Sequence, residues 1–304
     1  MGAPLLLAIM GPTASGKTSL AERVAEAIDA TLVNADAFQI YRGLDIGTSK
    51  PTRRERYELL DIREPDESFG LGEWLRLALD VLTESFEGAR NVVVVGGTGL
   101  YVRALFEEYA SISGPPDPDL RRRLNETPIE ELRQRLADEH PELASTVELS
   151  NPVRVRRALE RMQSTPPEPI HVPGFLKLKL GLSPPPEGVS ARIEHRAAEM
   201  VQNGWVQEVM RLRESNFRRE DPGLRAIGYR ALWDHIERKI SLDEALGRTV
   251  VETRRYAKRQ RTWLRSEPNL HELSATTENE AFDSAMERIG SVFDVRGISD
   301  GQGD

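Results

Sequence analysis

The chain has 304 residues, a formal net charge of −8 and no cysteine. This length allows one large domain with an insertion or two domains, and the acidic balance disfavours indiscriminate binding to nucleic acid without excluding a local basic surface. The absence of cysteine excludes disulfides, thiolate metal sites and cysteine nucleophiles, and the five histidines show no metal-ligand spacing. No apolar run approaches the ~20 residues that cross a bilayer, and no signal peptide is evident, so we expect a cytoplasmic protein.

A glycine-rich segment near the start of the chain predicts a phosphate-binding loop. Residues 5–10 are an apolar run typical of a buried strand, and residues 11–18 read Gly-Pro-Thr-Ala-Ser-Gly-Lys-Thr before an amphipathic helix at 17–28. The glycines let backbone N–H groups converge on phosphate oxygens, and the start of the helix favours an anion. In such a loop Lys17 reaches the outer phosphates and the Thr18 hydroxyl binds Mg²⁺.

Two further strands are expected to end at the same edge of the sheet as this loop. Residues 31–33 predict a strand that leads to Asp36, and residues 92–95 predict a buried parallel strand that leads to the glycine-rich turn 96–101. Open α/β sheets bind ligands at this edge, which favours a functional role for Asp36 over a turn-capping one. The second of these strands lacks the terminal aspartate of ATP hydrolases. The polar segment 45–51 is typical of an ordinary loop.

The rest of the chain predicts a helical insertion and a mainly helical second half. A helix is expected at 73–86, residues 176–182 alternate as a strand that rejoins the sheet, and helices follow from 189 onward. We therefore expect an α/β fold with a P-loop NTPase-like parallel sheet flanked by helices. The expected divisions are the first part of the core at 1–113, a helical insertion at 114–165, the remaining core with basic helices at 166–296, and a disordered tail at 297–304.

A cationic helix face is predicted near the end of the chain. Residues 248–265 carry seven cationic side chains and one acidic one. At about 100° per residue, four cations fall on one side of the helix: Arg254, Lys258, Arg261 and Arg265. Such a stripe favours a large anionic partner such as RNA, and a solvated face paired with acids elsewhere is the alternative. Arg192 and Arg196, four apart in a helix, are candidates for a phosphate clamp, although their spacing alone favours ordinary surface residues.

Seven motifs in order resemble the tRNA dimethylallyltransferase family, also called isopentenyl-tRNA transferases. They lie at 11–18, 36–41 with 45–51, 96–101, 154–160, 192–196, 227–230 and 257–263. Enzymes of this family transfer a dimethylallyl group from dimethylallyl diphosphate to the exocyclic amine of the adenosine immediately 3′ of the anticodon. The chain departs from the family pattern at Tyr57-Glu58, where a histidine pair is common. It lacks the zinc module of eukaryotic relatives, which implies a bacterial-type enzyme.

The resemblance implies a role for each matching residue. Asp36, Thr18 and Arg196 would be catalytic, with Asp36 as the general base towards the adenine amine and Thr18 as the Mg²⁺ ligand. The prenyl diphosphate would be bound by Gly11, Pro12, Thr13, Ala14, Ser15, Gly16, Lys17, Thr18 and Arg196. The tRNA would be contacted by Asp36, Ala37, Phe38, Gln39, Thr98, Arg121, Val153, Arg154, Val155, Arg156, Arg157, Lys258 and Arg259.

Other functions share parts of this pattern. A P-loop small-molecule kinase would use the loop for ATP, and an isopentenyltransferase acting on free adenine nucleotide would need no cationic face. An RNA-binding module with a vestigial loop is disfavoured by the intact Lys17, Thr18 and Asp36. We expect a monomer whose partners are tRNA and dimethylallyl diphosphate, with Mg²⁺ as cofactor and no membrane.

Overall fold

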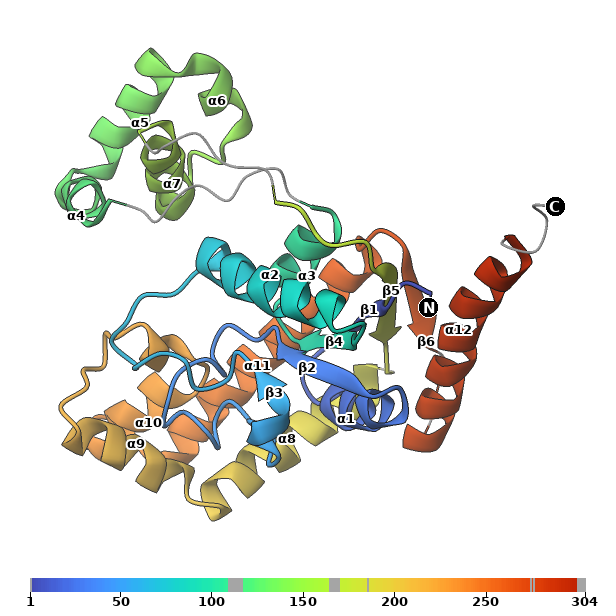
Figure 1. The fold of residues 1–304 in the computed structure, drawn as a ribbon. Helices are drawn as coiled ribbons and strands as arrows, with labels where there is room; N and C mark the ends of the chain where they lie inside the picture. Colours follow the sequence, from blue (N-terminus) through green and yellow to red (C-terminus); the bar gives the residue numbers. More distant parts are fainter. Residues whose placement is uncertain are drawn as a thin grey trace. The chain divides into compact units, whose positions relative to one another are not determined.

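A parallel β-sheet forms the centre of the computed structural model, which describes residues 2–108, 117–163, 170–184, 186–273, 275 and 277–299. The six strands lie in the order β3-β2-β4-β1-β5-β6, and every neighbouring pair is parallel (Figure 1). The strands are β1 (Leu5–Met10), β2 (Ala30–Asn34), β3 (Tyr57–Glu58), β4 (Asn91–Gly96), β5 (Leu176–Leu182) and β6 (Leu270–Leu273). The predicted α/β fold with a parallel sheet is confirmed.

Helices cover both faces of this sheet. One face packs against α1 and α12, and α2 and α3 lie on the other (Figure 1). The helices are α1 (Lys17–Ala27), α2 (Leu71–Glu87), α3 (Gly99–Phe106), α4 (Pro118–Glu126), α5 (Ile129–Glu139), α6 (Pro141–Thr146), α7 (Pro152–Met162), α8 (Pro186–Gln202), α9 (Trp205–Glu214), α10 (Tyr229–Ile236), α11 (Leu242–Arg265) and α12 (Glu278–Ser299). The central strands β1 and β4 are buried along their length, which accounts for their continuous apolar runs.

Gly96 allows the ends of β2 and β4 to approach closely. A Cβ atom at this position would lie 2.2 Å from the carbonyl carbon of Ala35. The backbone N–H of Thr98 donates to the carbonyl oxygen of Ala35 at 3.1 Å, and the hydroxyl oxygen of Thr98 accepts the N–H of Ala37 at 3.1 Å. The residues that follow the two strands, including Asp36, are thereby held side by side.

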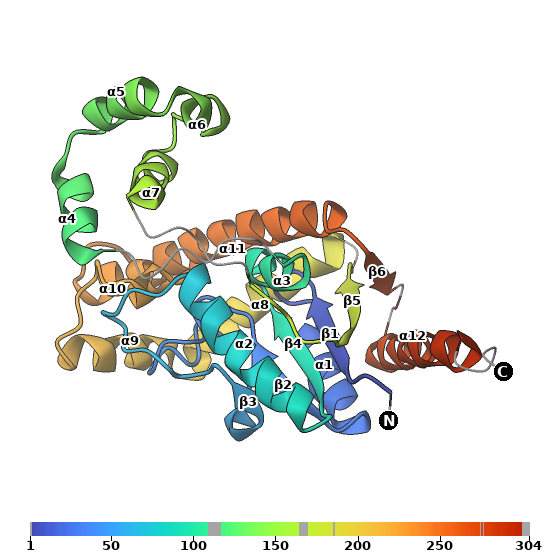
Figure 2. The same cartoon turned by 45° about the horizontal axis from the view of Figure 1, so that its top comes forward.

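The second half of the core is less uniformly helical than the sequence indicates. Helix α11 packs against α8 and α10 and also contacts α3, as Figure 2 shows. The chain from residue 189 onward was expected to be almost all helix, and the strand at Leu270–Leu273, which forms β6 beside β5, was not predicted. This edge strand has only four residues and exposes His271 and Glu272, so it carries little of the apolar signal that identifies a strand.

Residues Glu107–His171 form a compact unit that encloses the expected insertion 114–165. In its described part, helices α4 to α7 pack around a core of Leu120, Leu124, Leu132, Leu136, Val155, Ala158 and Leu159. Its expected boundaries and its contact with tRNA stay predictions. At the other end of the chain, α12 extends to Ser299, so 297–299 of the expected tail are helical and 300–304 lie outside the described residues. No helix among the described residues is long and apolar enough to cross a membrane.

Candidate active site

The phosphate loop opens a cavity of ≈430 Å³ at the carboxyl edge of the sheet. Residues 13–18, which join β1 to α1, all line it. Gly16 caps α1 with a φ of +85°, a left-handed conformation that favours glycine. The start of α1 therefore faces the cavity and favours an anion there. Gly11 and Pro12 are buried and do not line this cavity. Of the predicted diphosphate-binding residues of the loop, those from Thr13 to Thr18 therefore face it.

Cationic side chains outnumber carboxylates around this cavity. Among the described residues, its lining contains Lys17, Arg196, Arg225 and Arg259 against the single carboxylate of Asp36. Burial lowers the pKa of Lys17 to about 8. The negative charge of Asp36 opposes this shift only in part, and the positive charge of Arg196 adds to it. Burial also lowers the pKa of Arg196, opposed by Glu199. Concentrated positive charge with too few carboxylates is the arrangement that a diphosphate would stabilise.

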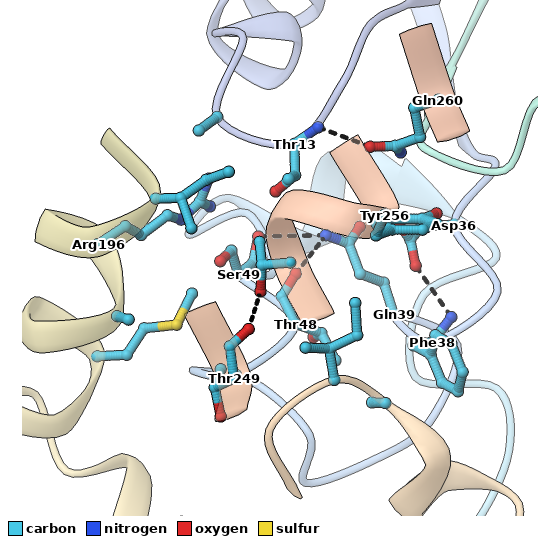
Figure 3. Close-up of a pocket in the computed structure, with 18 of the residues that line it drawn as sticks. Thr13, Asp36, Phe38, Gln39, Thr48, Ser49, Arg196, Thr249, Tyr256 and Gln260 are labelled. Atoms are coloured by element: carbon cyan, nitrogen blue, oxygen red, sulfur yellow. Dashed lines mark hydrogen bonds between the residues drawn. The ribbon is translucent and has the colours of Figure 1, made fainter. Parts of the chain in front are cut away.

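Asp36 is held rigidly on the other side of the cavity from Arg196 (Figure 3). Its Oδ1 accepts the backbone N–H of Phe38 at 3.0 Å, and its own N–H donates to Oδ1 of Asn34 at 3.1 Å. Asn34 is fixed in turn, because its carbonyl oxygen accepts the indole N–H of Trp74 at 2.8 Å. The local turn and the buried asparagine together give this carboxylate one orientation.

Helix α11 ties the two glycine-rich loops together through Gln260 and Tyr256. Oε1 of Gln260 accepts the backbone N–H of Thr13 at 2.8 Å, and Nε2 donates to the carbonyl oxygen of Gly97 at 2.9 Å. The Tyr256 hydroxyl donates to the same carbonyl at 3.2 Å, and burial, helped by the charge of Asp36, raises the Tyr256 pKa. The sequence analysis missed both residues. The two residues are four positions apart on the less charged side of α11, and this spacing could have indicated that they face the same neighbouring loops.

The segment 45–51, interpreted as an ordinary loop, forms the floor of the cavity through Gly47, Thr48 and Ser49. The buried carboxylate of Glu208 accepts three successive backbone N–H groups of this loop, at 2.9, 2.8 and 3.3 Å. It also accepts the Tyr229 hydroxyl at 2.6 Å.

Two further side chains hold the rest of this floor. The Lys50 ammonium, whose side chain is fully buried, lies 2.9 Å from Oδ1 of Asp45 and also pairs with Asp61. Nε2 of Gln39, a predicted tRNA contact, donates to the carbonyl oxygens of Thr48 and Ser49 at 3.0 and 3.2 Å.

The predicted tRNA contacts lie in four parts of the structure. Asp36, Phe38, Gln39 and Arg259 line the main cavity. Thr98 lines a smaller cavity of ≈260 Å³, which shares Tyr256, Arg259 and Gln260 with the first. Lys258 is exposed on α11. Ala37 lies beside Thr98 and donates its backbone N–H to the Thr98 hydroxyl at 3.1 Å. The remaining predicted contacts, Arg121 and Val153 to Arg157, belong to the compact unit Glu107–His171.

In that unit, several predicted contacts already have protein partners. Arg121 and Arg157 both pair with Glu160, at 2.9 and 2.6 Å, and although burial would raise the pKa of Glu160, these bonds hold it below its usual value. Arg154 pairs with Glu148 at 2.9 Å. Val155 has no exposed surface, because the apolar core of the unit takes up its side chain, and its contact with tRNA stays a prediction.

The predicted cationic stripe on α11 is narrower than its charge pattern indicates. Arg254 forms an ion pair with Glu194 of α8, and Arg261 is partly buried. Lys258 and Arg265 remain exposed, flanked by the exposed Arg259 and Arg255. Of the two candidate clamps, Arg196 lines the cavity, whereas Arg192 donates to the carbonyl oxygen of Ala14 at 3.0 Å and so supports the phosphate loop.

Comparisons with known proteins show the family to which this chain is similar. The IPP transferase family model matches residues 39–267, and an isopentenyl transferase model matches residues 4–62. The tRNA dimethylallyltransferase of Syntrophobacter fumaroxidans is 37% identical over 289 residues, covering 87% of this chain and 82% of that protein. The corresponding enzyme of Picosynechococcus sp. is 37% identical, with 91% and 95% covered.

Solved structures show the same relationship. The tRNA isopentenylpyrophosphate transferase of Bacillus halodurans superposes with a TM-score of 0.72 at 30% identity, over 97% of this chain and 99% of that chain. A eukaryotic dimethylallyltransferase acting on tRNA, 21% identical, shares the fold with a TM-score of 0.74 over 89% of this chain and 74% of that one. On the extent of the family match and of these identities, the chain belongs to the IPP transferase family.

Proposed function

We propose that this chain transfers the dimethylallyl group of dimethylallyl diphosphate to the exocyclic N6 amine of the tRNA adenosine immediately 3′ of the anticodon, releasing diphosphate. Family membership supports the chemistry. The observation that carries the proposal is the position of one carboxylate, Asp36, across the cavity from Arg196 (Figure 3), with Lys17 of the phosphate loop in the same lining. That arrangement separates a group that takes up a proton from the groups that stabilise a leaving anion.

The phosphate loop would hold the leaving group. The backbone N–H groups at the start of α1 would bind the diphosphate, with Lys17 and Arg196 beside it. As the bond between C1 of the prenyl group and the bridging oxygen breaks, its electron pair moves to the diphosphate. Fixed cations stabilise that charge more than the ground state, and one well-placed donor contributes on the order of 3 kcal/mol.

Asp36 would act on the acceptor. The adenine N6 atom attacks C1, a C–N bond forms, and the proton released from N6 passes to the carboxylate. Oδ1 accepts the N–H of Phe38, so we assign the proton to Oδ2. The base must leave its stack to reach the cavity, which costs a few kcal/mol and is least costly in a single-stranded loop such as an anticodon loop.

The residues around the phosphate loop fit Mg²⁺. The Thr18 hydroxyl lines the cavity at the start of α1, where the diphosphate would lie. Mg²⁺ keeps several waters and combines few protein ligands with phosphate oxygens. The described residues accordingly contain no cluster of three or more metal-ligating side chains. Bound through Thr18 and the diphosphate, Mg²⁺ would neutralise part of the leaving group's charge.

A diphosphate-release assay tests the proposal. The protein is incubated with dimethylallyl diphosphate and Mg²⁺, without ATP, and with either an unmodified tRNA transcript or AMP. We expect diphosphate release with the transcript and not with AMP. Release with AMP alone would favour a transferase that acts on free nucleotide. Binding of the transcript without release would favour an RNA-binding module. In a separate incubation with ATP and candidate metabolites, ATP consumption would favour a kinase.

A further inference from the structure

The cavity has an apolar end that the proposed proton and charge transfers do not use. Six apolar residues line it: Ile193, Ala197, Met200, Trp205, Ala226 and Ile227. The first three lie on α8 within about one helical turn of Arg196. A ligand whose phosphate is held by Arg196 therefore meets apolar surface next along this wall. An apolar surface adjoining a cationic cradle fits a hydrocarbon chain carried on a diphosphate.

Trp205 closes this apolar end as a fixed wall. Its indole is 1% exposed. A Cβ atom at Gly47 would lie 2.2 Å from its Nε1, and one at Gly228 would lie 2.1 Å from its Cη2. The backbones of two separate segments thus enclose the ring, and Tyr229 packs edge-on against it with a centroid distance of 5.7 Å. A ring enclosed in this way has no room to yield to a longer ligand.

Two motifs that the proposed chemistry leaves without a role hold the Trp205 indole in place. Gly47 belongs to the segment 45–51, and Gly228 and Tyr229 belong to the motif 227–230. Oε1 of Glu208 accepts both the Tyr229 hydroxyl at 2.6 Å and the backbone N–H of Gly47 at 3.3 Å. One buried carboxylate therefore joins the two segments that hold the indole.

We propose that Trp205, together with Met200, limits the prenyl chain that the site accepts to five carbons. Met200 packs against the same hydrophobic cluster as Trp205 and lines the same end of the cavity. A ten-carbon chain would need the space that the indole occupies. Because one methylene in an apolar pocket already changes specificity by about 10- to 200-fold, five extra carbons are expected to reduce transfer by on the order of 100-fold or more. This inference rests on the proposed function.

A competition between donors tests it. Equimolar dimethylallyl diphosphate and geranyl diphosphate, its ten-carbon analogue, compete for one tRNA transcript, and mass spectrometry of the digested RNA gives the ratio of the two prenylated nucleosides. The wild-type ratio is expected to exceed about 100, and Met200→Ala and Trp205→Phe should each lower it by about tenfold or more. The ratio is internal to each reaction, so a partial loss of folded protein does not change it.

The matched control is Met210→Ala, which removes an exposed methionine of α9 away from the cavity and should keep the wild-type ratio. The inference is overturned if the wild type uses both donors equally, or if Met200→Ala transfers the five-carbon group with an unchanged ratio. If Trp205→Phe does not fold, the ratio measured with Met200→Ala is sufficient to test the inference. Transfer of neither group by the wild type would instead overturn the proposed function and this inference with it.

Discussion

Residues 13–18 and residues 47–49 line the same cavity but are held by different parts of the chain. The first segment owes its turn to its own glycine and to the start of the helix that follows it, and distant residues support it at Thr13 and Ala14. The second is held by Glu208, which lies 161 positions away from Gly47 in the sequence. The difference teaches that a phosphate-binding segment can be identified from a local motif, whereas the surface that selects the rest of the ligand depends on distant partners.

The largest effect is expected where local motifs carry the chemistry. Asp36→Asn keeps the acceptor for the N–H of Phe38 but cannot take up the proton, so turnover should fall by about 10²- to 10⁴-fold. Diphosphate-donor affinity should change little, because Asp36 is assigned to the acceptor. Single-turnover rates measure the loss of turnover, and calorimetry measures the affinity for the diphosphate donor. Wild-type turnover in this variant would remove Asp36 from the mechanism.

Loss of the contacts that hold the cavity floor, residues 47–49, is expected to lower the stability of the protein. Glu208→Ala leaves three backbone N–H groups and the Tyr229 hydroxyl without their acceptor, so the free energy of unfolding should fall by about 3 kcal/mol or more. Urea denaturation measures it. Glu214→Ala, at the exposed end of the same helix, is the control and should change stability by less than about 0.5 kcal/mol. Equal losses in both variants would contradict the role given to Glu208.

The phosphate loop should also show a pH dependence that the floor lacks. Burial lowers the pKa of Lys17 to about 8 in the free protein, while a bound diphosphate favours the protonated ammonium. Donor binding therefore takes up a proton above that pKa, and affinity should weaken by up to about tenfold per pH unit as the pH rises beyond 8. Calorimetry across this range checks the slope. Lys17→Met should abolish it, and Lys258→Met, on the exposed face of α11, should keep it.

The smallest effect concerns the proposed RNA surface. Replacing Lys258 and Arg259 by glutamine should weaken tRNA binding and reduce the slope of log affinity against log salt by about 0.7 for each phosphate that is no longer neutralised. Filter binding at several salt concentrations measures the slope. Lys239→Gln, whose ammonium already pairs with Glu237 at 2.6 Å, should leave it unchanged. An unchanged slope in the double variant would place the RNA elsewhere.

These contrasts show what the sequence could predict. Lys17, Asp36 and Arg196 were expected at one site, and the structure places all three around one cavity. The positions of Lys17 and Asp36 follow from strand ends, which the sequence pattern reveals, whereas the resemblance to the family is what assigned Arg196 to this site. Gln260 was missed because it reaches Thr13 across 247 positions, and a single sequence does not show which distant elements pack together.

The same reason explains why the structure presents fewer free cations on the predicted RNA surface than the charge pattern indicates. The charges of α11 were visible in the sequence, but the pairing of Arg254 with Glu194 depends on how α8 packs beside it. The burial of Val155 likewise depends on the other helices of its unit. Helical periodicity identified the elements in both cases without showing which face each presents to its neighbours.

The most direct measurement is the position and mass of the modification on an unmodified tRNA transcript after incubation with dimethylallyl diphosphate and Mg²⁺. Nuclease digestion and mass spectrometry should find one five-carbon prenyl group on the adenosine immediately 3′ of the anticodon, and none with Asp36→Asn. A transcript that stays unmodified, or that carries the group on another nucleotide, would contradict the account.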